Sequence, residues 1–216
     1  MANKKIILIL AGIFAFSMAQ SQKYVDGENF RVGLKAGPIA SSLLGTALTK
    51  PSLNNGFTLG IYYKNKLKSG FHFQTEANAT MRGARFSGNG DLGYNKFTLF
   101  YFDAAQLIIK DLKKGDHSHV AVLGVQPSIL IQSWVYNPYF QMSPAARGIA
   151  LNGGDVFAVF GYQYNKKIFG IQSVVKIGLT NINRGLNMYD LLGKPLGPTK
   201  NNGTITNLSW ETTISF

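Results

Sequence analysis

The last nine residues, Leu208 to Phe216, constrain the fold more than any other stretch of the sequence. Read with a period of two, they divide into an apolar face and a polar face. The apolar face carries Leu208, Trp210, Thr212, Ile214 and Phe216, and the polar face carries Ser209, Glu211, Thr213 and Ser215. At the edge of a soluble sheet such a strand would be prone to aggregation, whereas in a membrane barrel one face meets lipid and the other meets the lumen. The segment therefore predicts the closing strand of a transmembrane β-barrel.

The first residues have the pattern of a secretory signal. Lys4 and Lys5 precede an apolar run from Ile6 to Phe16, and Ser17-Met18-Ala19 has the small-x-small spacing of a cleavage site. The alternative is a transmembrane anchor, but the apolar run is shorter than the roughly 20 residues that a spanning helix needs. We therefore expect a signal peptide over 1–19, a periplasmic N-terminal segment over 20–29 and one barrel domain over 30–216.

The amino-acid composition excludes several kinds of site and partner. The chain has no Cys, which excludes a disulfide framework, a thiolate metal site and a lipoprotein anchor. The formal net charge is +12, of which Lys4 and Lys5 contribute two. A basic balance can indicate nucleic acid, but in an exported chain it favours contact with anionic lipid or polysaccharide. We expect outer-membrane lipid as a partner and no nucleic acid.

Eight stretches alternate or are apolar enough to form strands, and the links between them alternate between long and short. The predicted strands are Phe30 to Gly37, Gly56 to Lys64, Phe71 to Met81, Phe97 to Lys110, His119 to Gln132, Asp155 to Tyr164, Ile168 to Thr180 and Thr204 to Phe216. The fourth has apolar residues on both faces, so its register does not follow from the pattern. The fold class is all-β, an eight-stranded antiparallel up-and-down transmembrane β-barrel with both termini periplasmic. A soluble lipocalin-like barrel is the rival.

Charged residues fall on the predicted inner face. They are Arg31, Lys35, Glu76, Asp103, Lys176 and Glu211. An eight-stranded barrel has an interior just wide enough to be filled by side chains, and an unpaired charge in it would cost several kcal/mol. We therefore predict a lumen ion network that plugs the barrel, with an ion or proton path as the alternative.

A search for catalytic and metal-binding patterns gives weak candidates. His72 and Glu76 share one face of the third strand, but the positions flanking His72 on that face are Gly70 and Gln74 and supply no nucleophile. The run Asp116-His117-Ser118-His119 resembles a chelate, although a solvated turn explains it equally. We predict no catalytic residues, no metal, no cofactor and no small-molecule substrate.

Two surfaces stand out at opposite ends of the predicted barrel. The short turns are rich in lysine, namely Lys64, Lys66, Lys68, Lys110, Lys113, Lys114, Lys166 and Lys167, which can reach lipid phosphates or an acidic periplasmic partner. The long links carry apolar residues, namely Trp134, Tyr136, Tyr139, Phe140, Met188 and Tyr189. These loops either fold over the barrel mouth as a lid or dock on another protein, and we favour docking.

The chain resembles the PorT-like outer-membrane β-barrel family of Bacteroidota over roughly 30–216. The residues that carry the resemblance are Asn55-Gly56-Phe57-Thr58-Leu59-Gly60, Arg82-Gly83-Ala84-Arg85, Tyr101-Phe102-Asp103-Ala104-Ala105, Gly178-Leu179-Thr180-Asn181-Ile182 and Phe216. The resemblance implies a barrel in the cell outer membrane, and some members of the family serve type IX secretion. The terminal Phe216, with Trp210, also resembles the signal by which outer-membrane proteins are passed to their assembly machinery.

These observations favour a non-enzymatic protein. The first hypothesis is an accessory or scaffold subunit of a larger outer-membrane complex, of a type IX secretion-like or assembly machinery. The second is a small surface binding or adhesion barrel whose outer loops meet glycan or a surface. The third is a lipid-modifying outer-membrane enzyme, whose catalytic groups would have to come from different strands.

Overall fold

The computed structural model describes residues 30–45, 51–87, 94–113, 117–137, 141–144, 149–151, 153–186 without 167–168, and 204–216. The predicted signal peptide and periplasmic segment fall outside these residues, as do Asp116, Tyr139, Phe140, Met188 and Tyr189. Tyr136 is described through its backbone alone. Among the residues described, no helix is long and apolar enough to cross a membrane.

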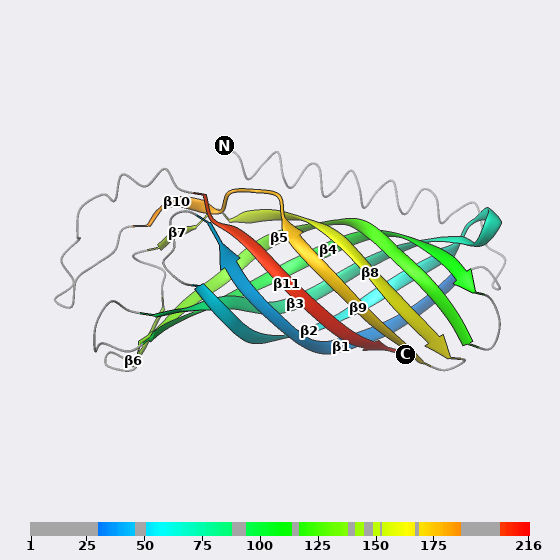
Figure 1. Ribbon diagram of the computed structural model, residues 1–216, viewed down its shortest axis with the longest axis horizontal. Coiled ribbons are helices and arrows are strands. Elements are labelled where there is room, and N and C mark those ends of the chain that lie inside the picture. Colours follow the sequence, from blue (N-terminus) through cyan, green and yellow to red (C-terminus); the bar gives the residue numbers. More distant parts are fainter. Residues whose placement is uncertain are drawn as a thin grey trace.

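Eight long strands form the body of the molecule, as the sequence predicts (Figure 1). They are β1 (Phe30–Leu44), β2 (Pro51–Lys66), β3 (Phe71–Ser87), β4 (Tyr94–Lys113), β5 (His117–Asn137), β8 (Gly154–Lys166), β9 (Phe169–Gly178) and β11 (Thr206–Ser215). Three short strands lie in the connections, namely β6 (Gln141–Pro144), β7 (Ile149–Leu151) and β10 (Asn183–Leu186), and were not predicted. A short 3-10 helix, η1 (Lys68–Gly70), joins β2 to β3.

The strands close into an antiparallel barrel. Each pairs with its neighbours in the chain, with β5 passing to β8 across the connection that contains β6 and β7. The barrel closes where β1 pairs with β11, with Ala36 opposite Ile214 and Ala40 opposite Trp210. Every pairing in the barrel is antiparallel, which is the up-and-down topology predicted from the alternating links.

The two ends of the barrel differ. The connections at one end are short, and η1 lies there; β6, β7 and β10 gather at the other end, on the left of Figure 1. We call these the short-turn end and the long-loop end.

Several strands run further toward the long-loop end than the alternating pattern predicts. Pro38 lies within β1, at a position where the β1–β11 register has a gap, since it has no N–H to donate.

Side chains alternate between an apolar outer face and a mostly polar or mixed inner face. On β11, Trp210, Ile214 and Phe216 are exposed, whereas Glu211 and Ser209 are buried. Exposed large apolar side chains continue around the barrel on every long strand. A soluble barrel has the opposite arrangement, with apolar residues inside and polar ones outside, so the pattern is that of a barrel surrounded by lipid.

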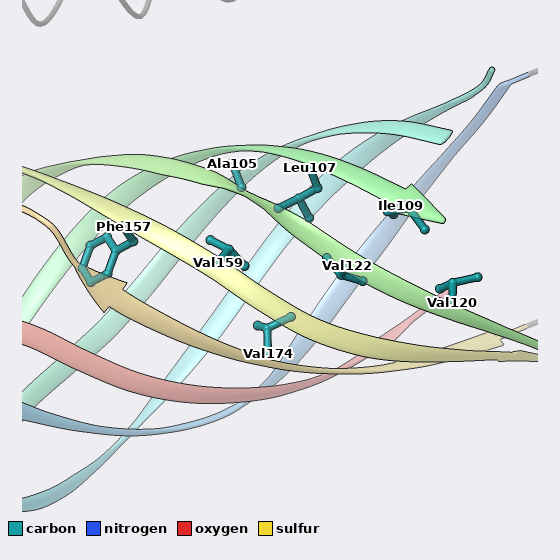
Figure 2. Packing of buried hydrophobic residues seen from close by; sticks show 8 residues of the cluster. All are labelled: Ala105, Leu107, Ile109, Val120, Val122, Phe157, Val159 and Val174. Atoms are coloured by element: carbon teal, nitrogen blue, oxygen red, sulfur yellow. The ribbon is translucent and has the colours of Figure 1, made fainter. Parts of the chain in front are cut away.

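The inside of the barrel is itself divided. Eight buried apolar side chains from β4, β5, β8 and β9 pack together on one side of the lumen (Figure 2). They are Ala105, Leu107, Ile109, Val120, Val122, Phe157, Val159 and Val174. Four buried charges, Lys35, Glu76, Arg82 and Glu211, lie on the opposite strands β1, β3 and β11. Three others, Asp103, Asp155 and Lys176, lie on β4, β8 and β9, each on the long-loop side of the cluster residues of its own strand. This division sets the register of β4, because its odd-numbered residues face inward and the even-numbered Phe102 and Ile108 face outward.

Candidate functional site

A four-residue charge layer crosses the middle of the lumen. Lys35 of β1 lies between two carboxylates, with its Nζ 2.8 Å from Glu76 Oε2 and 3.1 Å from Glu211 Oε1. Lys176 Nζ of β9 lies 2.5 Å from Glu211 Oε2. All four side chains are almost fully buried. The layer thus joins four strands around the barrel through two positive and two negative charges.

Uncharged side chains complete the hydrogen bonds of this layer. Glu76 accepts from Gln74 Nε2 at 2.7 Å and from Asn78 Nδ2 at 3.1 Å, both on the same strand and the same face. Gln172 Oε1 accepts from Lys35 Nζ at 3.1 Å and from Thr213 Oγ1 at 3.4 Å. Burying a charge costs several kcal/mol unless it is paired and hydrogen-bonded. Lys35 and Glu76 have both an ion-pair partner and an uncharged hydrogen-bond partner, whereas Lys176 and Glu211 are balanced by charged partners.

A second ion pair lies nearer the long-loop end. Arg82 of β3 donates from Nη2 to Asp103 Oδ2 of β4. The guanidinium also lies between two rings, 4.7 Å from the centroid of Tyr101 and 4.4 Å from that of Phe157. Arg82 is 1% exposed and Asp103 is fully buried. The cation–π contacts supply favourable interactions over the faces of the guanidinium, where hydrogen bonds cannot form.

A third polar group follows at the mouth of the long-loop end. Asp155 of β8 accepts from Asn207 Nδ2 at 2.6 Å and from Thr180 Oγ1, and Asn207 also donates to Tyr101 Oη at 3.4 Å. Because Tyr101 also contacts Arg82, this group continues directly from the Arg82–Asp103 pair. This group was not predicted from the sequence, in which Asp155 only begins a strand.

An apolar cluster lies beside these polar groups, at the long-loop end of the barrel. Its buried members are Leu43, Ala84, Leu99, Tyr101, Ile182 and Ile205. Ile182 N donates to Ile205 O at 2.9 Å, and Ile205 N donates to Asn181 Oδ1 at 2.9 Å, which ties the segment after β9 to the segment before β11. From the middle of the barrel to the long-loop end, the described interior is therefore filled by a charge layer, an ion pair, a polar group and apolar residues.

Five of the six predicted lumen residues fall into two groups. Lys35, Glu76, Lys176 and Glu211 come together in one layer, and Asp103 lies in the separate pair with Arg82. Arg31 is not part of either, because it is exposed near the start of β1, opposite Lys64 at the short-turn end. Arg82 was not predicted as a lumen residue, because the predicted third strand ends at Met81 and leaves Arg82 in the link that follows.

The weaker candidates for catalysis and metal binding do not converge. His72 Nε2 lies 3.1 Å from Asp111 Oδ1, while Glu76 is bonded within the charge layer. His117 and His119 each hydrogen-bond through Nδ1 to a tyrosine hydroxyl of β8, Tyr164 and Tyr162. Among the described residues, no group of three or more His, Cys, Asp or Glu could hold a metal ion.

The end of the chain is held by the barrel wall. Phe216 N donates to Leu34 O at 2.9 Å, and Leu34 N donates to Phe216 O at 3.2 Å. Tyr62 Oη also donates to Phe216 O, at 3.2 Å. On the outer face, Trp210 Nε1 donates to Ser173 Oγ at 2.8 Å. The two residues predicted as an assembly signal therefore lie on the exposed face of the closing strand, and the last residue takes part in closure.

Deletion of Phe216 is expected to weaken the barrel. Three hydrogen bonds are lost, and at a net value of about 1 kcal/mol each this amounts to about 3 kcal/mol of unfolding free energy. Urea unfolding of the refolded protein in detergent measures the loss. Tyr62→Phe, which removes one of the three bonds, should cost about 1 kcal/mol. Equal losses in the two variants would contradict this account.

The predicted docking loops are described only in part. Trp134 of β5 is partly exposed and pairs through its backbone with Pro144 of β6. The backbone of Tyr136 pairs with Met142 on β6 and Lys96 on β4. The β5–β6 hairpin thus extends the wall of the barrel at the long-loop end. This extension was not predicted, since both residues were expected in a loop.

Comparison with known proteins identifies the fold. No protein-family model matches the chain, and no curated protein matches it by sequence. Among solved structures, the chain is similar to the outer membrane protein OprG from Pseudomonas aeruginosa, with 10% identity, a TM-score of 0.51 and coverage of 87% of this chain and 94% of OprG. It is also similar to Ail, the attachment invasion locus protein of Yersinia pestis, with 12% identity, a TM-score of 0.46 and coverage of 87% and 99%. Ail has also been solved in complex with the heparin analogue sucrose octasulfate.

At these identities the likeness concerns the fold alone. Strand number, antiparallel closure, an apolar outer face and a lumen filled by side chains agree with it independently. The PorT-like resemblance is finer than the comparisons resolve. The chain is an eight-stranded antiparallel β-barrel with the fold of the outer-membrane barrels.

Proposed function

We propose that this protein is a sealed, non-enzymatic barrel of the cell outer membrane that acts as an accessory or scaffold subunit of a larger outer-membrane complex. The observation that carries the proposal is the filled interior. The charge layer of Lys35, Glu76, Lys176 and Glu211 and the pair of Arg82 and Asp103 occupy successive levels of the lumen. A barrel without an open path acts through its outer surface and its two ends.

The same geometry supports a membrane location and an orientation. The outer face offers exposed Leu, Ile, Val, Phe and Trp side chains on all eight long strands, which a water-exposed surface of this extent would not keep. In bacterial outer-membrane barrels the short turns face the periplasm and the long loops face outward. On this orientation the ends of β1 and β11 at the short-turn end, and so both termini of the barrel, are periplasmic.

The sealed interior is tested by conductance. The purified protein, reconstituted in planar bilayers, should give no steady openings at physiological salt, because the buried ion pairs leave no continuous water path. Steady openings on the nanosiemens scale would overturn the sealed barrel. Steady openings should also be absent when the voltage is reversed, since the charge layer has as many positive as negative groups.

The scaffold role is tested by co-purification from native membranes in mild detergent. A larger partner in fixed stoichiometry is expected, and Trp134→Ala should lower its yield without changing the barrel's gel mobility. Leu123→Ala, on the outward face of the same strand, is the matched control and should leave the yield unchanged. A solitary barrel that binds glycan through its loop end would instead favour the adhesion role and contradict the scaffold.

A further inference from the structure

Exposed lysines and leucines lie side by side at two places at the short-turn end, the turn from β2 to β3 and the last residues of β4. The turn from β2 to β3 reads Lys66-Leu67-Lys68, and Leu67 is 43% exposed. The end of β4 reads Leu112-Lys113, and Leu112 is 63% exposed. A solvated turn has no reason to present leucine to water beside each lysine, whereas a turn at a lipid surface can bury the leucine among acyl chains.

A fourth lysine, Lys110, is held in place beside them. Lys110 Nζ lies 3.8 Å from the centroid of the Phe71 ring and donates to Ser69 O at 2.7 Å. Ser69 has a positive φ of 62°, so the turn around η1 is sharply bent and its carbonyl points toward β4. Lys68 belongs to the same turn and is exposed. The Lys68 and Lys110 ammonium groups are therefore presented from adjacent elements, because Phe71 and Lys110 are paired across β3 and β4.

The acid nearest to these lysines along the chain already has a partner. Asp111 Oδ1 lies 3.1 Å from His72 Nε2, and both side chains are largely buried. Within the part of the chain that the structure describes, Lys66, Lys68, Lys110 and Lys113 form no ion pair with a carboxylate. The turn region thus carries excess positive charge on its exposed side.

An apolar surface begins directly beside the lysines. Phe71 is 39% exposed below the Lys110 ammonium, and Ile108, two residues from Lys110 on the same outward face, is 50% exposed. On β2, which pairs with β3, Ile61 is 54% exposed. A ligand that fits this surface therefore has an anionic head at the level of the lysines and an apolar tail that extends along the barrel wall.

We propose that the turn at Lys66–Lys68 and the end of β4 at Lys110–Lys113 form a binding site for an anionic phospholipid of the surrounding leaflet. The lysine ammonium groups contact the lipid phosphate, and the acyl chains lie against Phe71 and Ile108. An acidic protein would satisfy the lysines but not the exposed Leu67, Leu112 and Phe71, which is why we choose a lipid. The site does not depend on the scaffold role, since a solitary barrel in a membrane would bind the same lipid.

The test compares lipids that differ only in head group. Native mass spectrometry of the full mature chain, released from detergent, gives its relative affinity for phosphatidylglycerol and phosphatidylcholine with the same acyl chains. Wild-type protein should prefer phosphatidylglycerol. Lys68→Gln/Lys110→Gln should reduce that preference by about fivefold for each lysine removed, which corresponds to about 1 kcal/mol per charge.

The matched control removes two positive charges from β3 and β4 at the long-loop end of the barrel. Arg85→Gln/Lys96→Gln, paired across β3 and β4 at the long-loop end, should keep the full preference. Equal loss in the two double variants would overturn the site, because it would indicate a dependence on net charge alone. Displacement of phosphatidylglycerol by soluble glycerol phosphate at equal concentration would overturn the choice of a lipid, since the acyl chains would then contribute nothing.

Discussion

Replacing Glu211 with Gln is expected to lower the unfolding free energy of the barrel by about 3–5 kcal/mol, the range for breaking a buried ion pair. Glu211 is fully buried and is the only carboxylate that Lys176 contacts among the ion pairs of the described residues. It also lies 3.1 Å from Lys35. The substitution leaves two buried ammonium groups facing a single carboxylate, Glu76. Equilibrium unfolding in urea, followed by the gel mobility of unheated samples, measures the effect.

Two control variants separate the charge from the side chain. Glu211→Gln/Lys176→Met removes one charge of each sign, so it should recover a large part of the loss. Recovery should remain incomplete, because Lys35 also loses a contact. Lys166→Met, at an exposed position of β8, should change the unfolding free energy by less than about 0.5 kcal/mol. A loss for Glu211→Gln no greater than that of Lys166→Met would show that the layer is not held by its charges.

The strand number and the closure of the barrel could be predicted because lipid and lumen impose opposite requirements on alternate residues. β3 and β11 obey both requirements, and their predicted faces agree with the buried positions of Glu76 and Glu211. β4 meets the requirement for apolar residues toward lipid, but many of its lumen-facing residues are apolar too. Leu107 and Ile109 face the apolar side of the lumen while Ile108 faces outward, so all three are apolar and the register is invisible in the sequence.

The partners within the charge layer could not be assigned from the sequence. Period-two alternation places Lys35, Lys176, Glu76 and Glu211 on the inner face but does not give their heights in the lumen. Those heights depend on the tilt and register of strands that are distant in the sequence, such as β1 and β3. The same reasoning separates Asp103 from this layer, because its height matches that of Arg82 instead.

The parts of the strands near the long-loop end were the least predictable from the sequence. Beyond Met81 the chain reads Arg82-Gly83-Ala84-Arg85, in which glycine and small residues suggest a connection. β3 nevertheless continues to Ser87, because its backbone pairs with β4 on one side and with β2 on the other. Main-chain pairing between long strands thus outweighs the local preference, and it brings Arg82 into the lumen.

The Arg82–Asp103 pair should behave differently from the charge layer. Arg82→Met leaves Asp103 fully buried without its ion-pair partner, so we expect a loss of about 3–5 kcal/mol in unfolding free energy. Arg82→Met/Asp103→Leu removes both charges. We expect it to be as stable as the wild type or more stable by about 1–4 kcal/mol, because well-packed apolar replacements of buried ion pairs often have this effect. Urea unfolding of both variants in the same detergent measures the difference.

The contrast follows from the surroundings of the two sites. Arg82 is enclosed by the rings of Tyr101 and Phe157, and Leu99 lies in the apolar cluster above, so methionine and leucine would find apolar neighbours. Glu76 is enclosed by amides, which would lose their acceptor if the layer were replaced by apolar residues. A double variant of Arg82 and Asp103 that is as unstable as Arg82→Met alone would contradict this difference. It would mean that the Arg82–Asp103 pair, like the charge layer, is required for its hydrogen bonds as well as its charge balance.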